Sequence, residues 1–307
     1  MREIADIVRC CQRNPAGRFA LAKLVRARGS SYRRPGARML IAEGGDTAGS
    51  LSGGCLEEEV AERAREVIRT GFPTLMSFDT RRRFGCHGVI EIFLELAGAC
   101  LLRALSDAFH QRKTCCVSTV FEGDENRQGS RFVEAGNACP HGAFVQALTP
   151  EIQLVIVGDG PDTTALRSFA ATLGWRVSCV ASASELTGPF DEWTAALVET
   201  HNYGRDFAAL RTLARHDLRY IGLVGPRRRR DQLLADLMDT GVRPGANLFA
   251  PAGLDLGADS PEQIALAIVA EIQGVFAGGS LEALRERSAP IHAPAPARSL
   301  PAVSLGA

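Results

Sequence analysis

The feature of this 307-residue chain that most restricts its fold is the apolar run Leu-Val-Ile-Val at 154–157, followed at once by Gly158-Asp159-Gly160. A strand that is apolar on both faces is typical of the centre of a parallel sheet, where helices cover both sides. Glycines directly after such a strand allow a tight turn into a helix. The run therefore predicts the first strand and turn of a helix-covered parallel sheet.

Segments of strand and helix length alternate over the rest of this half. Strands are predicted at 175–181, 193–199 and 219–224, and helices at 161–173, 204–215, 226–240 and 260–277. Ser260 followed by Pro261 is typical of a helix start, because serine caps a free amide and proline fits the first turn. This alternation predicts a Rossmann-like, doubly wound parallel sheet.

The first half predicts a mixed α/β domain. Helices are expected at 3–13, 56–70 and 99–112, and strands at 18–28, 38–42, 74–79, 89–96, 114–121 and 143–148, with one short strand near 131–134. Thr149-Pro150 reads as a domain boundary. We therefore expect an α/β protein with an N-terminal domain at 1–149 and a Rossmann-like domain at 150–280. The Pro- and Ala-rich residues 288–307 are expected to form a disordered tail.

Composition argues against several classes of function. A formal net charge of +0 argues against a nucleic-acid partner, which would require a broad basic field. No run of about 20 apolar residues occurs, so no membrane span is expected. The N-terminus does not resemble a signal peptide, so a cytoplasmic location is expected. The nine cysteines include no CxxC pair and are expected to be free thiols.

Two cysteines lie in glycine-rich turns. Gly53-Gly54-Cys55 precedes a predicted helix, where free amides attract anions and lower the pKa of a thiol. Cys55 is thus a candidate thiolate ligand or nucleophile, although a small buried cysteine packed against glycines explains the residues equally well. Cys86, between Gly85 and His87 and after an arginine run, is a second candidate for close approach to a ligand. A solvated surface turn is the simpler explanation of those arginines.

The turn at Gly158 and Gly160 matches only part of the dinucleotide-binding pattern. Thr163 stands at the third glycine position, where its Cβ is expected to crowd the packing of helix on strand. The second strand ends in Ala181-Ser182 rather than in an acid that would bind a ribose hydroxyl. We therefore favour a Rossmann fold without a dinucleotide over one that binds NAD(P).

A second group of candidates follows the later strands of the same half. Arg227 and Arg228 begin a predicted helix directly after an apolar strand, at the carboxyl edge where open α/β sheets bind ligands. Helix amides and guanidinium groups together would bind a phosphate. His201 ends the neighbouring strand at the same edge, although simple helix capping also explains Thr200-His201-Asn202.

These motifs together resemble one family, the xanthine dehydrogenase accessory proteins (XdhC/CoxI). The matching segments, in chain order, are 29–31, 34–39, 49–57, 84–86, 90–93, 154–160, 173–175, 200–201 with 206, 222–225 and 251–258. Several motifs in the same order across two domains are far more specific than a lone glycine fingerprint.

The resemblance implies an accessory protein, not an enzyme, that carries the molybdenum cofactor as cargo. It would protect the cofactor during sulfuration by a cysteine desulfurase and deliver it to an apo-molybdoenzyme of the xanthine dehydrogenase type; a homodimer is compatible with the family. Residues matched to the family's motifs and suited to bind the cargo are Arg34, Arg38, Gly53, Gly54, Cys55, Cys86, Gly158, Gly160, His201, Arg227 and Arg228. Cys55 and Cys86 would be the contacts to molybdenum.

The sequence departs from the family at three points. Pro161 replaces a histidine and Thr163 a small residue, His87 replaces a glycine, and Ala181-Ser182 replace acids. These changes bear on nucleotide binding more than on the cysteine turns. Two rival hypotheses remain: an NAD(P)-dependent oxidoreductase, and a scaffold that binds the client enzyme and desulfurase without a small-molecule cargo.

Overall fold

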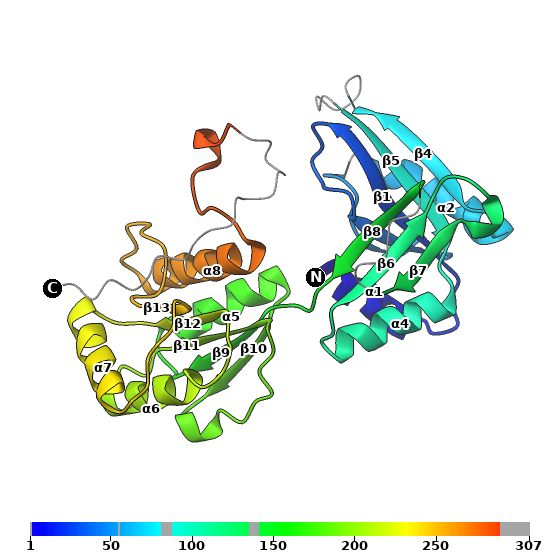
Figure 1. Ribbon diagram of the computed structural model, residues 1–307. Helices are drawn as coiled ribbons and strands as arrows, with labels where there is room; N and C mark the ends of the chain where they lie inside the picture. The colour runs from blue at the N-terminus through cyan, green and yellow to red at the C-terminus, as the bar shows by residue number, and fades with distance from the viewer. Residues whose placement is uncertain (1, 55, 81–87, 135–140, 289–307) are drawn as a thin grey trace. The chain divides into compact units, whose positions relative to one another are not determined.

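The computed structural model describes residues 2–54, 56–80, 88–134 and 141–288, and the chain divides into two compact units, Met1–Pro150 and Glu151–Ala307 (Figure 1). Each unit has its own hydrophobic core. Within the described ranges, no helix is long and apolar enough to span a membrane.

The first unit is built on a five-stranded antiparallel sheet in the order β3-β2-β1-β5-β4. Its strands are β1 (Phe19–Gly29), β2 (Arg38–Ala42), β3 (Thr47–Gly49), β4 (Thr74–Asp79) and β5 (Gly88–Leu96). Helix α2 (Glu57–Thr70) packs on one face, through Val60, Ala64, Val67 and Ile68. Helices α1 (Arg2–Arg13) and α4 (Ala99–His110) pack on the other face.

A smaller antiparallel sheet completes this unit. Its order is β7-β6-β8, with β6 at Cys115–Val120, β7 at Gly129–Val133 and β8 at Ala143–Leu148. A 3₁₀ turn at Glu125–Arg127 lies between β6 and β7. Val117 of β6 and Leu148 of β8 join the core cluster that also contains α1 and α4. The two sheets are therefore parts of one packed unit.

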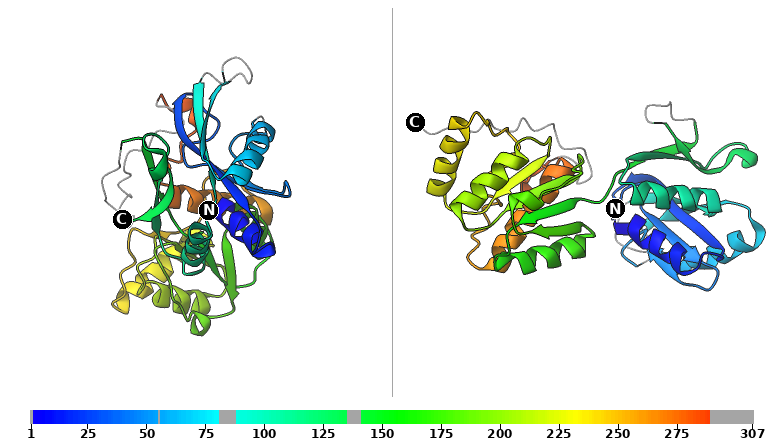
Figure 2. Two further views of the ribbon diagram at one scale, coloured as in Figure 1. Left: turned by 90° about the vertical axis from the view of Figure 1, so that its right-hand side faces the viewer. Right: turned by 90° about the horizontal axis from the view of Figure 1, so that it is seen from below.

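The second unit is a five-stranded parallel sheet in the order β10-β9-β11-β12-β13. Its strands are β9 (Gln153–Val157), β10 (Arg176–Val180), β11 (Thr194–Val198), β12 (Tyr220–Leu223) and β13 (Leu248–Phe249). Helices α5 (Asp162–Leu173) and α8 (Pro261–Ala277) cover one face, while α6 (Tyr203–Leu213) and α7 (Arg227–Asp239) cover the other (Figure 2). The predicted doubly wound α/β class is confirmed, and the strand order reverses direction between β9 and β11.

The sequence located most elements within two residues but missed two short strands. Thr47–Gly49 pairs with β2, and Leu248–Phe249 pairs with β12, and both are too short to show a periodic pattern. The helix start predicted at Ser260 is confirmed as a capping box, because its hydroxyl accepts from the amide of Gln263 and that residue's side chain accepts from the Ser260 amide.

Candidate binding site

The turn after β9 places backbone, not side chains, at the carboxyl edge of the parallel sheet. Gly158 has φ +128°, and a Cβ there would lie 2.7 Å from the carbonyl oxygen of Glu199, at the end of β11. The amide of Gly158 bonds to the carbonyl of Val180 at 3.0 Å, while that of Glu199 bonds to Val157 at 2.9 Å. The strands on both sides of the point where the strand order reverses are thus held close together.

Thr163, at the third glycine position of the dinucleotide pattern, makes a polar contact with the end of β11. Its hydroxyl donates a hydrogen bond to Oε1 of Glu199, which is fully buried. Burial, together with the negative charge of Asp162 and Asp159, raises the pKa of Glu199 to about 7, although the hydrogen bond from Thr163 acts in the opposite direction. Within the part of the chain that the structure describes, Oε2 of Glu199 has no hydrogen-bond partner. Thr163, which stands where the dinucleotide pattern requires glycine, therefore holds the buried carboxyl group of Glu199 in place.

His201 follows this acid in an unusual backbone conformation. It is exposed and has φ +54°, a left-handed value that side chains rarely adopt. A Cβ at Gly160 would lie 3.0 Å from its Nε2, so the ring packs against that glycine. Asn202 caps α6 by accepting from the amide of Arg205 at 3.1 Å. Capping thus accounts for Asn202, whereas the His201 ring lies against the glycine turn before α5.

The four arginines at the start of α7 divide into two pairs. Arg229 forms an ion pair with buried Asp206 of α6, and Arg230 donates to the carbonyl of Ala250 at 3.1 Å. Arg227 and Arg228, the two that the sequence selected, are exposed in the first turn of α7. They add positive charge to a helix N-terminus at the carboxyl edge, which is the arrangement that binds anions.

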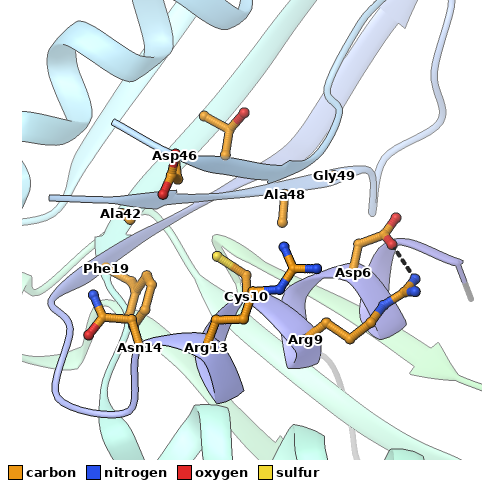
Figure 3. Close-up of a pocket in the computed structure, with 11 residues that line it drawn as sticks. Asp6, Arg9, Cys10, Arg13, Asn14, Phe19, Ala42, Asp46, Ala48 and Gly49 are labelled. Carbon is orange, nitrogen blue, oxygen red and sulfur yellow. Dashed lines mark hydrogen bonds and ion pairs between the residues drawn. The ribbon is translucent and has the colours of Figure 1, made fainter. Parts of the chain in front are cut away.

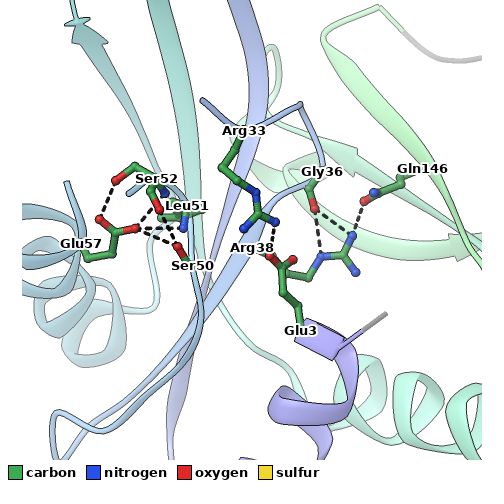
Figure 4. A network of polar contacts seen from close by, with 9 residues as sticks. All are labelled: Glu3, Arg33, Gly36, Arg38, Ser50, Leu51, Ser52, Glu57 and Gln146. Carbon is green, nitrogen blue, oxygen red and sulfur yellow. Dashed lines mark hydrogen bonds and ion pairs between the residues drawn. The ribbon is translucent and has the colours of Figure 1, made fainter. Parts of the chain in front are cut away.

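In the first unit, the two cysteines selected from the sequence, Cys55 and Cys86, lie outside the described residues. Gly53 and Gly54 are exposed at the end of the loop before α2. Glu57, in the first turn of α2, organises this loop (Figure 4): its carboxylate accepts hydrogen bonds from the backbone amides of Leu51, Ser52 and Leu56 and from the hydroxyls of Ser50 and Ser52. These bonds lower the pKa of Glu57 to about 2.

The two arginines that the family resemblance selected lie in different surroundings. Arg34 is exposed in the turn after β1. Arg38 is 4% exposed, and its guanidinium donates to the carbonyl of Gly36 and to the side chain of Gln146 (Figure 4). Burial lowers the pKa of Arg38 to about 10. Arg38 therefore holds β2 against β8, and only Arg34 remains available to a ligand.

The first unit also contains a hollow that the sequence did not reveal. It encloses about 580 Å³ between α1 and β3, and its polar lining includes Asp6, Arg9, Cys10, Arg13 and Asp46 (Figure 3). Arg9 is paired with Asp6 at 2.5 Å. Burial raises the pKa of Cys10, so its sulfur stays a neutral thiol near pH 7. A helical stripe of polar residues is usually solvated, which is why sequence reasoning passed over this cleft.

The end of β10 does not have the dinucleotide-binding arrangement. Glu185, the nearest acid, accepts hydrogen bonds from the amide of Ala181 at 3.1 Å and from the hydroxyl of Ser182 at 3.1 Å. Its carboxylate is therefore engaged by the turn itself. Among the described residues, no group of three or more His, Cys, Asp or Glu side chains could hold a metal ion.

A Rossmann-type domain with charged groups at its carboxyl edge, preceded by a mixed α/β domain, defines a two-domain α/β binding protein. Comparison with known proteins narrows this class. Residues 13–79 match the model of the XdhC and CoxI family, and residues 154–272 match that of the XdhC Rossmann domain. The chain belongs to the XdhC and CoxI family, which confirms the resemblance found in its motifs.

Two relatives agree with this assignment. The chain is 30% identical to a protein of Bacillus subtilis named as a probable subunit of xanthine dehydrogenase, over 82% of this chain and 91% of the relative. It is 26% identical to the molybdenum cofactor insertion chaperone PaoD of Escherichia coli, over 83% of this chain and 82% of PaoD. A relative with this name agrees with an accessory protein rather than a catalyst.

The fold is shared with a crystal structure of a xanthine dehydrogenase from Bacillus halodurans. The TM-score is 0.75 at 24% sequence identity, and the match covers 90% of this chain and 96% of the other. This similarity shows that both units of the fold occur in one known protein.

Proposed function

We propose that this protein binds the molybdenum cofactor and delivers it to an apo-molybdoenzyme of the xanthine dehydrogenase type, after protecting it during sulfuration by a cysteine desulfurase. The observation that carries the proposal is the similarity to a molybdenum cofactor insertion chaperone over 83% of the chain. The cargo is a pterin whose dithiolene holds molybdenum and whose side chain ends in a phosphate or nucleotide. It therefore requires groups that accept an anion and groups that approach a metal.

Each requirement has candidates in the chain. Arg227 and Arg228 supply unburied positive charge at the first turn of α7, which suits a phosphate. The Gly158 turn brings backbone to the same edge of the sheet. In the first unit, Glu57 shapes the loop that contains Gly53 and Gly54, and Cys55, which follows them in the sequence, is the proposed sulfur ligand.

The test is to express the protein in cells that make the cofactor and to measure the pterin that remains bound after purification. Oxidation converts the bound cofactor to a fluorescent pterin, which we expect in amounts approaching one per chain. Cys55→Ala should retain at most about one tenth of it, because even the loss of a residue that supports a metal ligand typically lowers metal affinity about 10–100-fold. Cys100→Ala, at an exposed cysteine of α4, is the matched control and should retain all of it.

Absence of pterin from the wild-type protein, together with failure to slow the decay of added cofactor, would rule out the cargo role. A client enzyme captured by such a cargo-free protein would favour the scaffold hypothesis instead. Calorimetry with NAD and NADP addresses the oxidoreductase alternative, for which binding at micromolar concentration is the required result.

A further inference from the structure

The carboxyl edge of the parallel sheet carries opposite charges on its two faces. Glu199 and Thr200 are consecutive residues at the end of β11, and strand geometry turns them to opposite sides. Glu199 bonds to Thr163 of α5. Thr200 donates from its hydroxyl to Asp206 of α6 at 2.5 Å. The strand end therefore separates an α5/α8 face from an α6/α7 face.

The α5/α8 face is acidic. Asp159 precedes α5, and Asp162, which is 5% exposed, lies in its first turn beside His201 and Glu262 of α8. Glu199 is fully buried beneath them, and its Oε2 is without a partner among the described residues. Negative charge from Asp159 and Asp162 reaches Glu199. A phosphate placed here would meet four carboxyl groups, whereas a ligand with N–H donors would satisfy them.

The α6/α7 face has the complementary character. Arg227 and Arg228 are exposed there, and Arg205 in the first turn of α6 donates to the carbonyl of Ala181. Asp206, a buried acid on this face, is neutralised by Arg229. An anion is therefore accommodated on this side of β11 and not on the other.

We propose that Glu199 recognises the N–H donors of a 2-amino-4-oxopyrimidine ring, so that the pterin end of the cargo occupies the α5/α8 face and its phosphate the α6/α7 face. This inference rests on the proposed function and adds an orientation to it. The amino group and the adjacent ring N–H of such a heterocycle point the same way, and a carboxylate accepts both. Oxygen Oε2 supplies the free acceptor, while Thr163 holds Oε1 in place.

His201, two residues after this acid, lies at the glycine turn before α5. Its ring packs against Gly160, whose Cβ position lies 3.0 Å from Nε2 and 3.8 Å from the carbonyl oxygen of Glu199. Because Glu199 is fully buried, a ring that reaches it must displace groups that cover it, and in the proposed complex the imidazole is one of them. Replacement of His201 by Asn keeps a residue that tolerates φ +54° and removes the imidazole. We therefore expect His201→Asn to bind the pterin ring at least as tightly as the wild type.

The experiment measures quenching of fluorescence in the full-length protein by two probes, 6-hydroxymethylpterin, which has no phosphate, and the corresponding lumazine, in which an oxo group replaces the 2-amino group. The wild type should prefer the pterin by about tenfold, the value of one hydrogen bond to a charged group. Glu199→Gln should weaken pterin binding by about tenfold and abolish the preference. Arg227→Ala with Arg228→Ala should change the affinity for this phosphate-free probe less than twofold, while weakening its phosphate ester.

Recognition by Glu199 also predicts that pterin affinity depends on pH, which a merely structural role of this residue would not. Binding of N–H donors favours the ionised carboxylate, so pterin affinity should rise from pH 5.5 to 7.5. Asp159, Asp162, Glu262 and His201 also face this position, and His201→Asn tests whether the imidazole contributes to the rise. The rise should persist in His201→Asn and disappear in Glu199→Gln.

The outcomes separate the two proposals. If the wild type retains the molybdenum cofactor but Glu199→Gln binds 6-hydroxymethylpterin as the wild type does, the orientation is wrong and the cargo role stands. If the wild type binds neither the cofactor nor the pterin, the cargo role itself fails. Thermal unfolding of Glu199→Gln establishes that it folds, and Thr163→Val, which frees Oε1 without altering the acid, should keep the preference for pterin over lumazine.

Discussion

The backbone amide of Ser52 donates a hydrogen bond of 2.8 Å to the carboxylate of Glu57, five residues further along the chain. The Ser52 hydroxyl donates to the same carboxylate at 2.6 Å, and the amide of Leu56 at 3.1 Å. An acid in the first turn of a helix is expected to stabilise the helix dipole. Here it also closes the loop that contains Gly53 and Gly54.

Glu57→Gln should loosen this loop. The amide side chain has one acceptor oxygen in place of two, so the donors from Ser52 and Leu56 cannot all be satisfied. We expect a loss of about 1–3 kcal/mol in the free energy of unfolding and faster hydrogen exchange over 50–54. Glu58→Gln, in the same turn but exposed, is the control. Equal exchange rates in the two variants would remove Glu57 from its role in the loop.

The same carboxylate predicts a response to acid. The hydrogen bonds hold the pKa of Glu57 at about 2 in the folded protein, below its ordinary value of 4.5. Its contribution to stability is therefore complete above about pH 4.5 and declines as the pH falls toward 2. Glu57→Gln should unfold with a smaller dependence on pH over this interval in urea titrations.

A buried lysine gives a second rise of stability with pH, at neutral to alkaline pH. Lys23 of β1 is 3% exposed, and its Nζ donates to the hydroxyls of Thr119 at 2.5 Å and Ser130 at 3.0 Å. Burial lowers the pKa of Lys23 to about 7 from 10.5. The unfolded chain therefore binds more protons than the folded one between these values, and stability rises as the pH increases from 7 to about 10.

Lys23→Met should abolish that rise. At about 1.4 kcal/mol per pKa unit, the difference amounts to roughly 3–4 kcal/mol across the interval. The hydroxyls of Thr119 and Ser130 are bonded to each other at 2.8 Å, and we expect this bond to persist in the variant. The chain has one other lysine, Lys113, which is exposed, so Lys113→Met is a matched control. NMR of the two ¹³C-methylated lysines measures both pKa values directly, and a Lys23 value near 10 would contradict the prediction.

The sequence predicted what depends on local pattern. The apolar run at 154–157 and the Ser260 cap are both determined within a few residues, and the structure has them where expected. The hydrogen bond made by Thr163 could not be predicted, because its partner, Glu199, lies 36 residues away and no local pattern connects them. Arg38 looked like a ligand-binding residue for the same reason, since its partner Gln146 is distant in the chain.

A substitution at Gly158 tests how closely the ends of β9 and β11 approach each other. Gly158→Ala introduces two unfavourable effects, a φ of +128° and a contact of 2.7 Å with the carbonyl of Glu199. Gly45 has φ +96° with nothing within 4 Å, so Gly45→Ala isolates the effect of the backbone conformation. We expect a loss of about 1 kcal/mol for Gly45→Ala and at least about 3 kcal/mol for Gly158→Ala in urea unfolding. Equal losses would show that β11 yields to the added methyl group.

The ion pair between Asp206 and Arg229 should be strongly coupled. Asp206 is fully buried and also accepts from the amide of Thr200 at 3.2 Å, so removal of either charge leaves the other with poor solvation. Asp206→Asn and Arg229→Met should each lower the free energy of unfolding by about 3–5 kcal/mol. The double variant should lose clearly less than the sum of the two, because neither charge then remains unpaired.

The two single variants and the double variant form a double-mutant cycle, for which the exposed pair Arg63 and Glu66 of α2 provides the reference. Solvent screens such pairs, and its coupling energy should be about 0.5 kcal/mol or less. Additive losses at Asp206 and Arg229 would mean that the two charges are solvated separately. Arg229 would then be as free as Arg227 and Arg228 to bind an anion. Coupling of about 2 kcal/mol or more instead restricts phosphate binding at α7 to those two exposed arginines.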